Sequence, residues 1–534
     1  MRIQNPIIPG FHPDPSIIRV NDTYYIANST FEWFPGVSIH QSKNLKDWEL
    51  LTYPLATAQM LDLRGVLNGG GVWAPCLSYR DGTYYLVFSI VRTDEERMLD
   101  VDNYLTTAGH IKGPWTMPVC LNSGGFDASL FHDEEDHTAW LVQMKWDFQP
   151  GNNLFRGIFM QKYDDMHKKL VGKSICIFKG TDRGFTEGPH LYRHGAYYYL
   201  MTAEGGTRDG HCITMARSLK REGPYETDPE NPILSSAQQP AWPIQYAGHG
   251  DLFEDGHGNW YLVHLGVRRD LAAGYSVMGR ETFLQQCHWT KDHWFRPDTG
   301  RLPQETVEVR TVCEEHPIAE TFYRTYTFDS PCLDIHFSTL RIPLKEDCLS
   351  LKDRPGYLRL KGRESIFSKH HQVMAALRLS EISFQAETEF EFEPENFQQT
   401  AGLTFFYNTA NFYYCFISRE TAVGKHLQVM LRDNNQMRYL LEDPIRLSEG
   451  PIRIRAEFCP AGIQFFYSQG TDTTKAVINE KAEQLPIKIL SDEYATESGE
   501  QGFTGTFLGL CCQDLTGSRK PADFKYLKVS RLDP

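Results

Sequence analysis

The chain has 534 residues, of which 41% are hydrophobic and 13% aromatic, and its formal net charge is −14. Single hydrophobic cores stop growing at roughly 250–300 residues, so the length predicts two domains. The acidic balance and the lack of a dense Lys/Arg run argue against nucleic acid as a partner. No stretch approaches the roughly 20 apolar residues of a membrane-spanning helix, so no membrane partner is expected.

The N-terminal stretch MRIQNPIIPGFHPDPS has no apolar region of the roughly 7–15 residues that a secretory signal needs. The twelve cysteines contain no pair with zinc-ligand spacing. Cys511 and Cys512 are adjacent, which suits neither an ordinary structural disulfide nor a metal site. These features predict reduced thiols in a cytoplasmic protein.

Five segments of the N-terminal part resemble one another. Each is a short apolar strand, a polar turn rich in Gly, Asn or Asp, and an aromatic strand, which is the chemistry of a β-hairpin. Their leading positions are spaced by 60, 53, 60 and 63 residues, enough for about four strands and their loops in each repeat. The repeats therefore predict an all-β fold that begins with a five-bladed β-propeller over residues 1–312. The leading residues are Asp14, Ala74, Asp127, Glu187 and Gly250.

The composition changes near residue 300. All ten tryptophans lie at or before Trp294, and residues 295 to about 325 have the composition of a linker. From Tyr326 onward, alternating strands with turn residues between them predict a β-sandwich over residues 325–534.

Three of the five leading positions carry a carboxylate: Asp14, Asp127 and Glu187. Equivalent positions of different blades lie on one ring around a propeller axis, so these side chains are expected to converge at one mouth of the channel. Trp73 and His249 directly precede the other two leading positions and are expected beside the ring. His249 could hold a hydroxyl of a substrate, support a metal or fill the channel.

Each carboxylate also has an ordinary interpretation. Asp14 precedes a proline and could start a turn, Asp127 could be a turn acceptor, and Glu187 could lie in a solvated loop. Together at one register they predict a site for glycoside hydrolysis, which needs one carboxylic acid to protonate the leaving oxygen and one carboxylate to activate water or attack the sugar. A third acid can raise the pKa of the proton donor.

The sequence resembles glycoside hydrolase family 43, and within it the two-domain β-xylosidases. The matching stretches are NPIIPGFHPDPSI, GGGVWAPCLSY, GGFDASLF, FTEGPHLY, YAGHGDLF and MGRETF, followed by FDSPCLDIHF and GTFLGLCCQDLTG in the second domain. The resemblance implies that Asp14 is the general base, Glu187 the general acid, and Asp127 the residue that tunes the pKa of Glu187 and orients it. It also implies inversion of the anomeric configuration.

The resemblance further implies a substrate-binding set. Arg280 is expected to bond hydroxyls of the terminal sugar, with a plain salt bridge as its alternative. Phe507 is expected to close one side of the pocket, with Phe503 as a rival and sandwich core as the ordinary interpretation. A pocket closed in this way admits only a chain end, which predicts exo-acting release of xylose from xylobiose and longer β-1,4-xylo-oligosaccharides. The remaining members are Trp73, Phe31, Trp146, Thr207 and His249.

Several alternatives stay open at this point. α-L-Arabinofuranosidase activity, alone or as a side activity, depends on pocket shape, and an endo-acting arabinanase or xylanase would need an open groove. A non-catalytic sugar-binding propeller would not need all three acids. WD-type repeats are shorter, at roughly 40–45 residues, and the Asn-Asp-Pro-Asn opening typical of retaining fructosidases is absent. No cofactor is expected to be required, with a calcium ion in the propeller channel as an open alternative, and the resemblance implies a homo-oligomer such as a tetramer.

Overall fold

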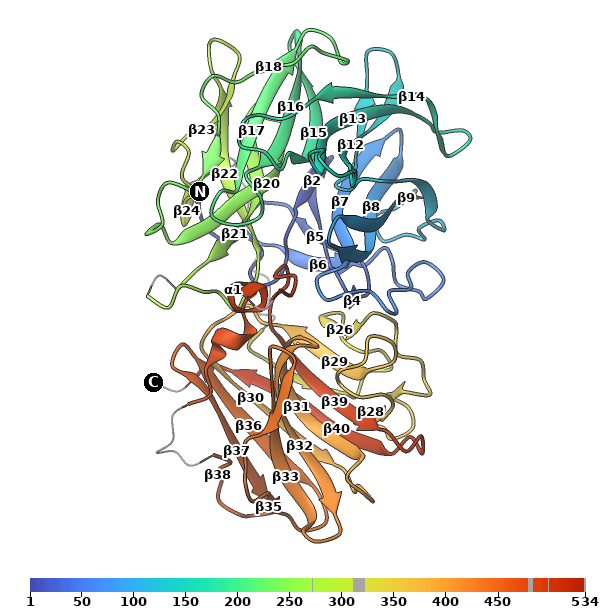
Figure 1. Ribbon diagram of the computed structural model, residues 1–534, viewed down its shortest axis with the longest axis vertical. Coiled ribbons are helices and arrows are strands. Elements are labelled where there is room, and N and C mark those ends of the chain that lie inside the picture. Colours follow the sequence, from blue (N-terminus) through green and yellow to red (C-terminus); the bar gives the residue numbers. More distant parts are fainter. Residues whose placement is uncertain (271, 311–321, 479–483, 498, 533–534) are drawn as a thin grey trace. The chain divides into compact units, whose positions relative to one another are not determined.

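The computed structural model describes residues 1–270, 272–310, 322–478, 484–497 and 499–532. They form two compact units, which are described one by one (Figure 1). The first unit comprises Met1–Leu61, Gly70–Gly274 and Arg280–Ile318, and the second comprises Asp62–Gly69, Tyr275–Gly279 and Ala319–Pro534. Within the described ranges, helix is confined to the 3-10 turn η1 (Ile487–Leu490) and to α1 (Asp492–Glu497) of the second unit.

The first unit is a five-bladed β-propeller, as predicted. Each blade is a separate antiparallel sheet whose innermost strand is the first in the chain. Blade 1 contains β2 (Ser16–Val20), β3 (Thr23–Asn28), β5 (Ser38–Ser42) and β6 (Glu49–Thr52), with β4 (Trp33–Phe34) in the connection between β3 and β5. Blade 2 contains β7 (Gly71–Arg80), β8 (Thr83–Glu95), β9 (Met98–Ala108) and β10 (Val119–Ser123). Blade 3 contains β11 (Ser129–Asp133), β12 (Thr138–Trp146), β13 (Phe155–Asp164) and β14 (Lys169–Phe178).

The last two blades follow the same plan. Blade 4 contains β15 (Glu187–His194), β16 (Tyr197–Glu204) and β17 (Cys212–Ser218), and both β18 (Glu226–Thr227) and β19 (Leu234–Ser235) pair with β17. Blade 5 contains β20 (Ile244–Glu254), β21 (Trp260–Arg268), β22 (Glu281–Trp289) and β23 (Phe295–Pro297). The predicted hairpins are the two innermost strands of every blade. In blade 1, for example, Val20 pairs with Thr23 across a two-residue turn that contains Asn21 at φ 57°, the left-handed conformation that such turns require.

The N-terminal segment closes the ring of blades. The side-chain amide of Asn5 donates a hydrogen bond to the carbonyl of Leu284 in β22 at 2.9 Å, and the amide of Ile7 donates to Thr282 of the same strand at 2.9 Å. Beyond them, β1 (Arg2–Gln4) pairs with β24 (Thr306–Glu308). The two ends of the propeller sequence are therefore joined by hydrogen bonds.

The second unit is a β-sandwich, which confirms the predicted fold class. Strands such as β30 alternate strictly between buried and half-buried residues, the pattern of a sheet with one face on the core. The first sheet contains β27 (Leu349–Ser350), β28 (Leu358–Lys361), β40 (Pro521–Ser530), β30 (Phe384–Glu391), β36 (Ile452–Cys459), β37 (Gly462–Gln469) and β38 (Lys475–Ala476), with β25 (Thr325–Thr327) beside β40. The second contains β34 (Gln436–Tyr439), β33 (Gly424–Asp433), β32 (Asn411–Glu420), β31 (Gln399–Asn408), β39 (Phe507–Asp514), β29 (Val373–Arg378) and β26 (Phe337–Leu340), with β35 (Ile445–Arg446) beside β33.

Two short segments that lie within the propeller part of the sequence belong to this second unit. In Asp62–Gly69, the amide of Leu63 donates to the carbonyl of Arg341 at 3.1 Å, and the Arg341 guanidinium donates in return to the carbonyl of Val66 at 3.1 Å. In Tyr275–Gly279, the carbonyl of Val277 accepts a hydrogen bond from the amide of Thr506 at 3.0 Å, and Val277 joins the sandwich core. The membership of these two segments in the second unit cannot be told from their position in the sequence.

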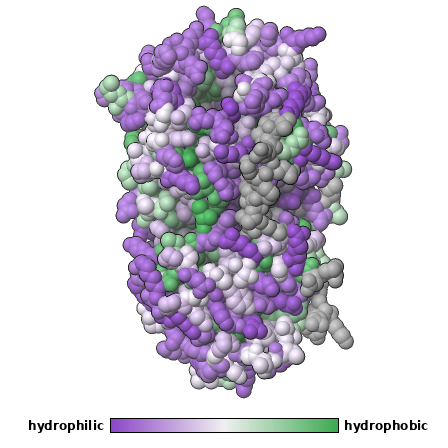
Figure 2. Space-filling model, turned by 180° about the vertical axis from the view of Figure 1, so that it is seen from behind, coloured by the Kyte–Doolittle hydropathy of each residue, from purple (hydrophilic) through white to green (hydrophobic). Residues whose placement is uncertain are grey.

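The described residues contain no helix long and apolar enough to cross a membrane. The face of the molecule in Figure 2 is mostly hydrophilic, with apolar side chains showing in patches.

Candidate active site

A left-handed residue marks the same point near the start of the innermost strand in every blade. An L-residue adopts this conformation at a cost, so its recurrence at one place in five sheets defines the structural register of the repeats. The spacings are 60, 53, 61 and 61 residues, which is more regular than the spacing read from the sequence. The five residues are Asp14 (φ 50°), Ala74 (φ 34°), Asp127 (φ 53°), Gly188 (φ 55°) and His249 (φ 40°).

This register corrects the sequence alignment of two repeats by one residue. The equivalent of Asp14 and Asp127 is Gly188 in blade 4 and His249 in blade 5, whereas the sequence pattern placed Glu187 and Gly250 at that point. Strand pairing is broken at this point in β15, between Glu187 and His190, and also in β20 and β7. Such bulges shift the register by a residue and re-aim a side chain.

The structure nevertheless brings the three carboxylates together. Glu187 lies close enough to Asp127 and Asp14 for both charges to act on its carboxyl group. The backbone amide of Gly188 donates a hydrogen bond to Asp127 Oδ2 at 3.0 Å, which ties the residue after Glu187 to Asp127. All three side chains are buried.

The carboxylate of Asp14 has a different set of neighbours. The Ser29 hydroxyl donates a hydrogen bond to its Oδ2 at 2.6 Å, and the same hydroxyl accepts one from the amide of Ala74 at 2.7 Å. Nη1 of Arg280 and Nδ1 of His249 each lie 3.7 Å from Asp14 Oδ1.

Burial and like charges raise the pKa of two of the three acids. Burial, together with the charges of Asp127 and Asp14, raises the pKa of Glu187 well above its usual range. Burial and then the Asp14 charge raise the pKa of Asp127 to about 8. Burial also lowers the pKa of His249 to about 4, which keeps its ring neutral.

Arg280 connects the carboxylates to a row of aromatic rings. Its guanidinium carbon lies 5.4 Å from the centre of the Phe31 ring, and that ring lies 5.9 Å from Trp73. Trp73 meets Phe126 edge to face at 5.5 Å, and Phe126 lies 6.1 Å from Trp146. The predicted aromatics Phe31, Trp73 and Trp146 thus form one continuous wall.

Sequence reasoning missed two residues of this wall. Phe126 lies between Trp73 and Trp146, and it occupies the same position before the left-handed residue in blade 3 as Trp73 does in blade 2. Arg97, at the tip of the β8–β9 hairpin, accepts a hydrogen bond on its carbonyl from the Trp146 indole at 2.8 Å. Its guanidinium also donates to four carbonyls between Asp147 and Asn152. The position of Phe126 before Asp127 was a usable signal, whereas nothing local pointed to Arg97.

The last two predicted residues are Thr207 and Phe507. Thr207 is half-buried in the loop between β16 and β17. Phe507 begins β39 in the second unit, where it is buried and pairs with Phe406, and the Arg378 guanidinium carbon lies 5.4 Å from its ring centre. The role of Phe507 as a pocket wall stays a prediction.

A second ring of polar side chains fills the channel two residues beyond the left-handed positions. Asp251 is at its centre: Oδ2 accepts hydrogen bonds from the Ser16 hydroxyl at 3.1 Å and the Ile17 amide at 2.9 Å, and Oδ1 accepts one from the Tyr192 hydroxyl at 2.6 Å. Nδ1 of His190 lies 3.7 Å from Oδ1. This network joins blades 1, 4 and 5 beneath the carboxylates. Among the residues that the structure describes, no group of three or more His, Cys, Asp or Glu side chains could hold a metal ion.

Comparisons with known proteins agree with this site. Residues 3–295 match the model of glycosyl hydrolases family 43, and residues 325–530 match that of the β-xylosidase C-terminal concanavalin A-like domain. A β-xylosidase of Bacillus subtilis (strain 168) is 42% identical over 99% of both chains, and a xylan 1,3-β-xylosidase of a Vibrio species is 40% identical over 98% of both. Xylosidase/arabinosidase 43B of Humicola insolens is 40% identical over 98% of this chain and 97% of its own.

The agreement extends to a solved structure. The crystal structure of xylan β-1,4-xylosidase from Bacillus halodurans C-125 superposes with a TM-score of 0.95 at 44% identity, over 99% of this chain and all of the other. Both the whole length and the order of the two domains are shared. The chain belongs to glycosyl hydrolases family 43.

Proposed function

We propose that this glycoside hydrolase is an exo-acting, inverting β-xylosidase. It removes xylose from the non-reducing end of β-1,4-xylo-oligosaccharides, from xylobiose upward. The observation that carries the proposal is the buried cluster of Asp14, Asp127 and Glu187, in which Glu187 has a raised pKa and Asp14 faces Arg280. The relatives named as β-xylosidases over their whole length support the substrate class.

The proposed mechanism is a single displacement with two carboxyl groups in different protonation states. Asp14 takes a proton from a water molecule, whose oxygen attacks the anomeric carbon of the terminal xylose. Glu187 donates its proton to the glycosidic oxygen, which leaves with the rest of the chain. Inversion requires roughly 6.5–9.5 Å between the two carboxyl groups, so that the water fits. After release, one proton returns from Asp14 to Glu187 through solvent.

Asp127 keeps Glu187 ready for this step. Its charge raises the pKa of Glu187, and its bond to the Gly188 amide holds the backbone that carries Glu187. Arg280 is proposed to bind hydroxyls of the terminal sugar beside Asp14, and His249, neutral because of its lowered pKa, to accept or donate a further bond. Phe31, Trp73 and Trp146 supply apolar faces for the rings of the substrate, Thr207 a hydroxyl, and Phe507 the proposed closing wall.

An α-L-arabinofuranosidase side activity is part of the proposal. Two relatives carry both names, the enzymes of Humicola insolens and Butyrivibrio fibrisolvens called xylosidase/arabinosidase. Xylopyranose and arabinofuranose can present similar hydroxyl arrangements, so one set of hydrogen-bonding groups can serve both.

One experiment tests the function. Wild type, Asp14→Ala and Glu187→Ala are mixed separately with β-1,4-xylobiose, and the anomer released is followed by proton NMR. We expect wild type to release α-xylose first and both variants to be nearly inactive. First release of β-xylose would contradict inversion, and an untouched disaccharide would contradict the substrate. Parallel reactions with β-1,3-xylobiose and an arabinofuranoside decide linkage and side activity.

We further propose that the enzyme is a cytoplasmic homo-oligomer that requires no cofactor. The eleven cysteines in the described part of the chain are free, which suits a reducing compartment. A cytoplasmic enzyme would act on imported oligosaccharides. Gel filtration with light scattering tests the oligomeric state, and activity after dialysis against EDTA tests the need for calcium.

A further inference from the structure

A cavity of about 440 Å³ lies in the propeller at the far end of the innermost strands from the carboxylates. Its lining includes Phe131, Tyr192 and Phe253, and each lies four residues after the left-handed residue of its blade. A strand rises by about 3.3 Å per residue, so the cavity is about 13 Å further along the channel than the carboxylate ring. It is therefore separate from the candidate active site, although its volume is in the range of small-ligand pockets.

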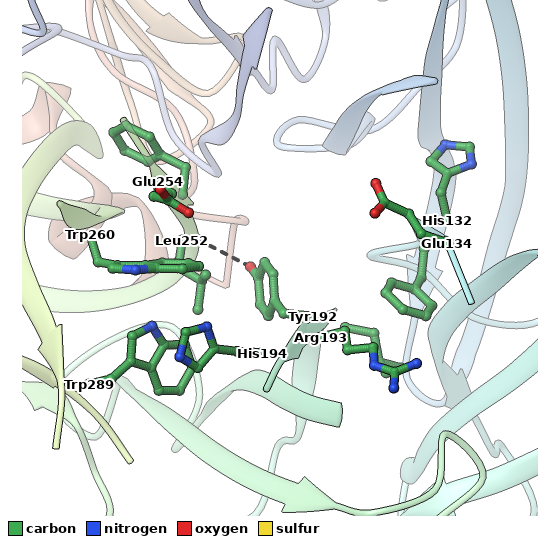
Figure 3. A pocket seen from close by; sticks show the side chains of 12 residues that line it. His132, Glu134, Tyr192, Arg193, His194, Leu252, Glu254, Trp260 and Trp289 are labelled. Atoms are coloured by element: carbon green, nitrogen blue, oxygen red, sulfur yellow. Dashed lines mark hydrogen bonds between the residues drawn. The ribbon is translucent and has the colours of Figure 1, made fainter. Parts of the chain in front are cut away.

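One wall of the cavity is aromatic. Figure 3 shows Trp260, Trp289 and His194 gathered on one side, with Tyr192 facing the centre. His194 stacks on Trp289 at 4.2 Å with an angle of 6° between the rings, and Trp260 meets Trp289 edge to face at 5.4 Å. Both tryptophans are only partly buried. The protein thus holds these large aromatic side chains in fixed contacts with one another while part of their surface stays exposed to solvent.

The opposite wall and the rim are polar. Figure 3 shows His132 and Glu134 across the cavity from the tryptophans, and Glu254 close to Trp260. Glu134 and Glu254 are exposed, and the Glu134 carboxylate has no hydrogen-bond or ion-pair partner within the described ranges of the chain. Burial lowers the pKa of His132 to about 4, so its ring is neutral. Arg193 at the rim is already paired with Glu135.

This combination favours one ligand chemistry. A pyranose ring has apolar C–H faces that cover an aromatic ring, and hydroxyls at its edge that donate to carboxylates. The carboxylates of Glu134 and Glu254 in the lining disfavour an anion by charge repulsion. A cation cage needs aromatic faces that converge on one point, whereas the near-perpendicular contact of Trp260 and Trp289 uses the edge of one ring.

We propose that this cavity is a second carbohydrate-binding site that takes a short neutral xylose chain, with Trp260 as the stacking surface and Glu134 and Glu254 as hydroxyl acceptors. The sugar identity rests on the proposed function, whereas the binding of a neutral oligosaccharide does not. Such a site retains substrate or product chains on the enzyme without taking part in hydrolysis.

Calorimetric titration of xylotriose tests the proposal in the Glu187→Gln background, which does not consume the ligand. We expect two binding events per chain. Adding Trp260→Ala should weaken one of them by about tenfold or more and leave the other unchanged. In the wild-type background, Trp260→Ala should leave kcat/KM for an aryl xyloside unchanged. Trp115→Ala, at a partly exposed tryptophan between β9 and β10, is the matched control and should keep both events.

Other outcomes overturn the proposal. A single event, or two events that Trp260→Ala does not alter, removes the second site. Binding of tetramethylammonium that Trp260→Ala abolishes, without binding of xylotriose at the same site, would assign the cavity to a cation instead. If Trp260→Ala lowers the melting temperature strongly, Glu134→Gln replaces it as the deciding variant, and unchanged affinity there contradicts the assignment. If maltotriose binds and xylotriose does not, the cavity is a sugar site but the xylose identity fails, and the xylobiose reaction shows separately whether the proposed function stands.

Discussion

The backbone amide of Gly188 donates a hydrogen bond to the carboxylate of Asp127 at 3.0 Å. Glu187, the proposed proton donor, is therefore held through its own neighbour by the residue whose charge raises its pKa. A Cβ at position 188 would lie 3.1 Å from the Nε2 atom of His249, and the residue has φ 55°, so glycine suits this place on both counts. The contact makes Asp127 the natural first target for mutation.

Asp127→Asn should shift the pH dependence of kcat/KM. The amide keeps an acceptor for Gly188 but removes the charge that raises the pKa of Glu187. The pKa of Glu187 then falls, so its acid form is lost at a lower pH. We expect the basic limb of the profile to move to lower pH and the rate at neutral pH to fall by about 10²-fold or more. An unmoved basic limb would show that Asp127 does not control the titration of Glu187.

The same substitution should stabilise the fold in mild alkali. A carboxyl group whose folded pKa is raised to about 8 favours the folded state below its unfolded pKa near 4, and this contribution is lost as pH rises through the folded pKa. Wild type should therefore lose stability between about pH 4 and pH 8 relative to Asp127→Asn. Thermal melts across this range should show the variant gaining a few degrees at the upper end. Parallel melting curves at all pH values would contradict the buried-charge argument.

Glu187→Gln should separate substrates by their leaving groups. Xylobiose needs protonation of its glycosidic oxygen, and loss of a general acid typically costs about 10²–10⁴-fold. An aryl xyloside with an acidic phenol leaves without that help, so its hydrolysis should be much less affected. Steady-state rates on both substrates test this, with Glu226→Gln on the exposed strand β18 as the control. Equal losses on both substrates would remove Glu187 from the role of acid.

Ser29→Ala should lower the rate of the reaction by disturbing the orientation of Asp14, while leaving all three carboxyl groups in place. The hydroxyl bridges the Ala74 amide and Asp14, so its removal leaves a buried donor unpaired and frees the orientation of Asp14. An unsatisfied buried donor costs about 1–3 kcal/mol, so the free energy of unfolding should fall by this order. We expect kcat to fall while the affinity for a bound xylose product changes little. Ser29→Cys, which keeps a weak donor, should be intermediate, and a pure loss of affinity would argue against the bridge.

Arg97→Ala should weaken substrate binding from a distance. Its guanidinium holds the segment from Asp147 to Asn152, and its carbonyl holds the Trp146 indole, so loss of the side chain frees the loop beside the aromatic wall. We expect KM to rise several-fold with kcat little changed. Arg97→Lys can donate hydrogen bonds to only some of the four carbonyls, so its KM should lie between those of wild type and Arg97→Ala. A fall in kcat alone would show that Trp146 is not held by this contact.

Much of the architecture could be read from the sequence because the repeats are local. The hairpin at Val20 and Thr23, and its equivalents in the other blades, follow from adjacent strands and short turns. The choice of Glu187 rather than Gly188 as the equivalent of Asp14 could not be checked in the sequence, because the left-handed backbone that marks this position is seen only in the fold. The Phe126 position could have been found by aligning it with Trp73, but the Arg97 contact joins residues some 50 positions apart. Long-range contacts of this kind depend on how blades pack, which no single repeat encodes.

The membership of Asp62–Gly69 and Tyr275–Gly279 in the second unit has a practical meaning for dissection of the enzyme. No single cut yields two intact halves: a chain ended near residue 318 would carry two orphaned loops, and a separately made sandwich would lack two pieces of its own packing. A chimaera that takes the sandwich of a relative would also need that relative's versions of the two segments. Changes in the sequence of the sandwich must therefore stay compatible with the two segments that pack into it.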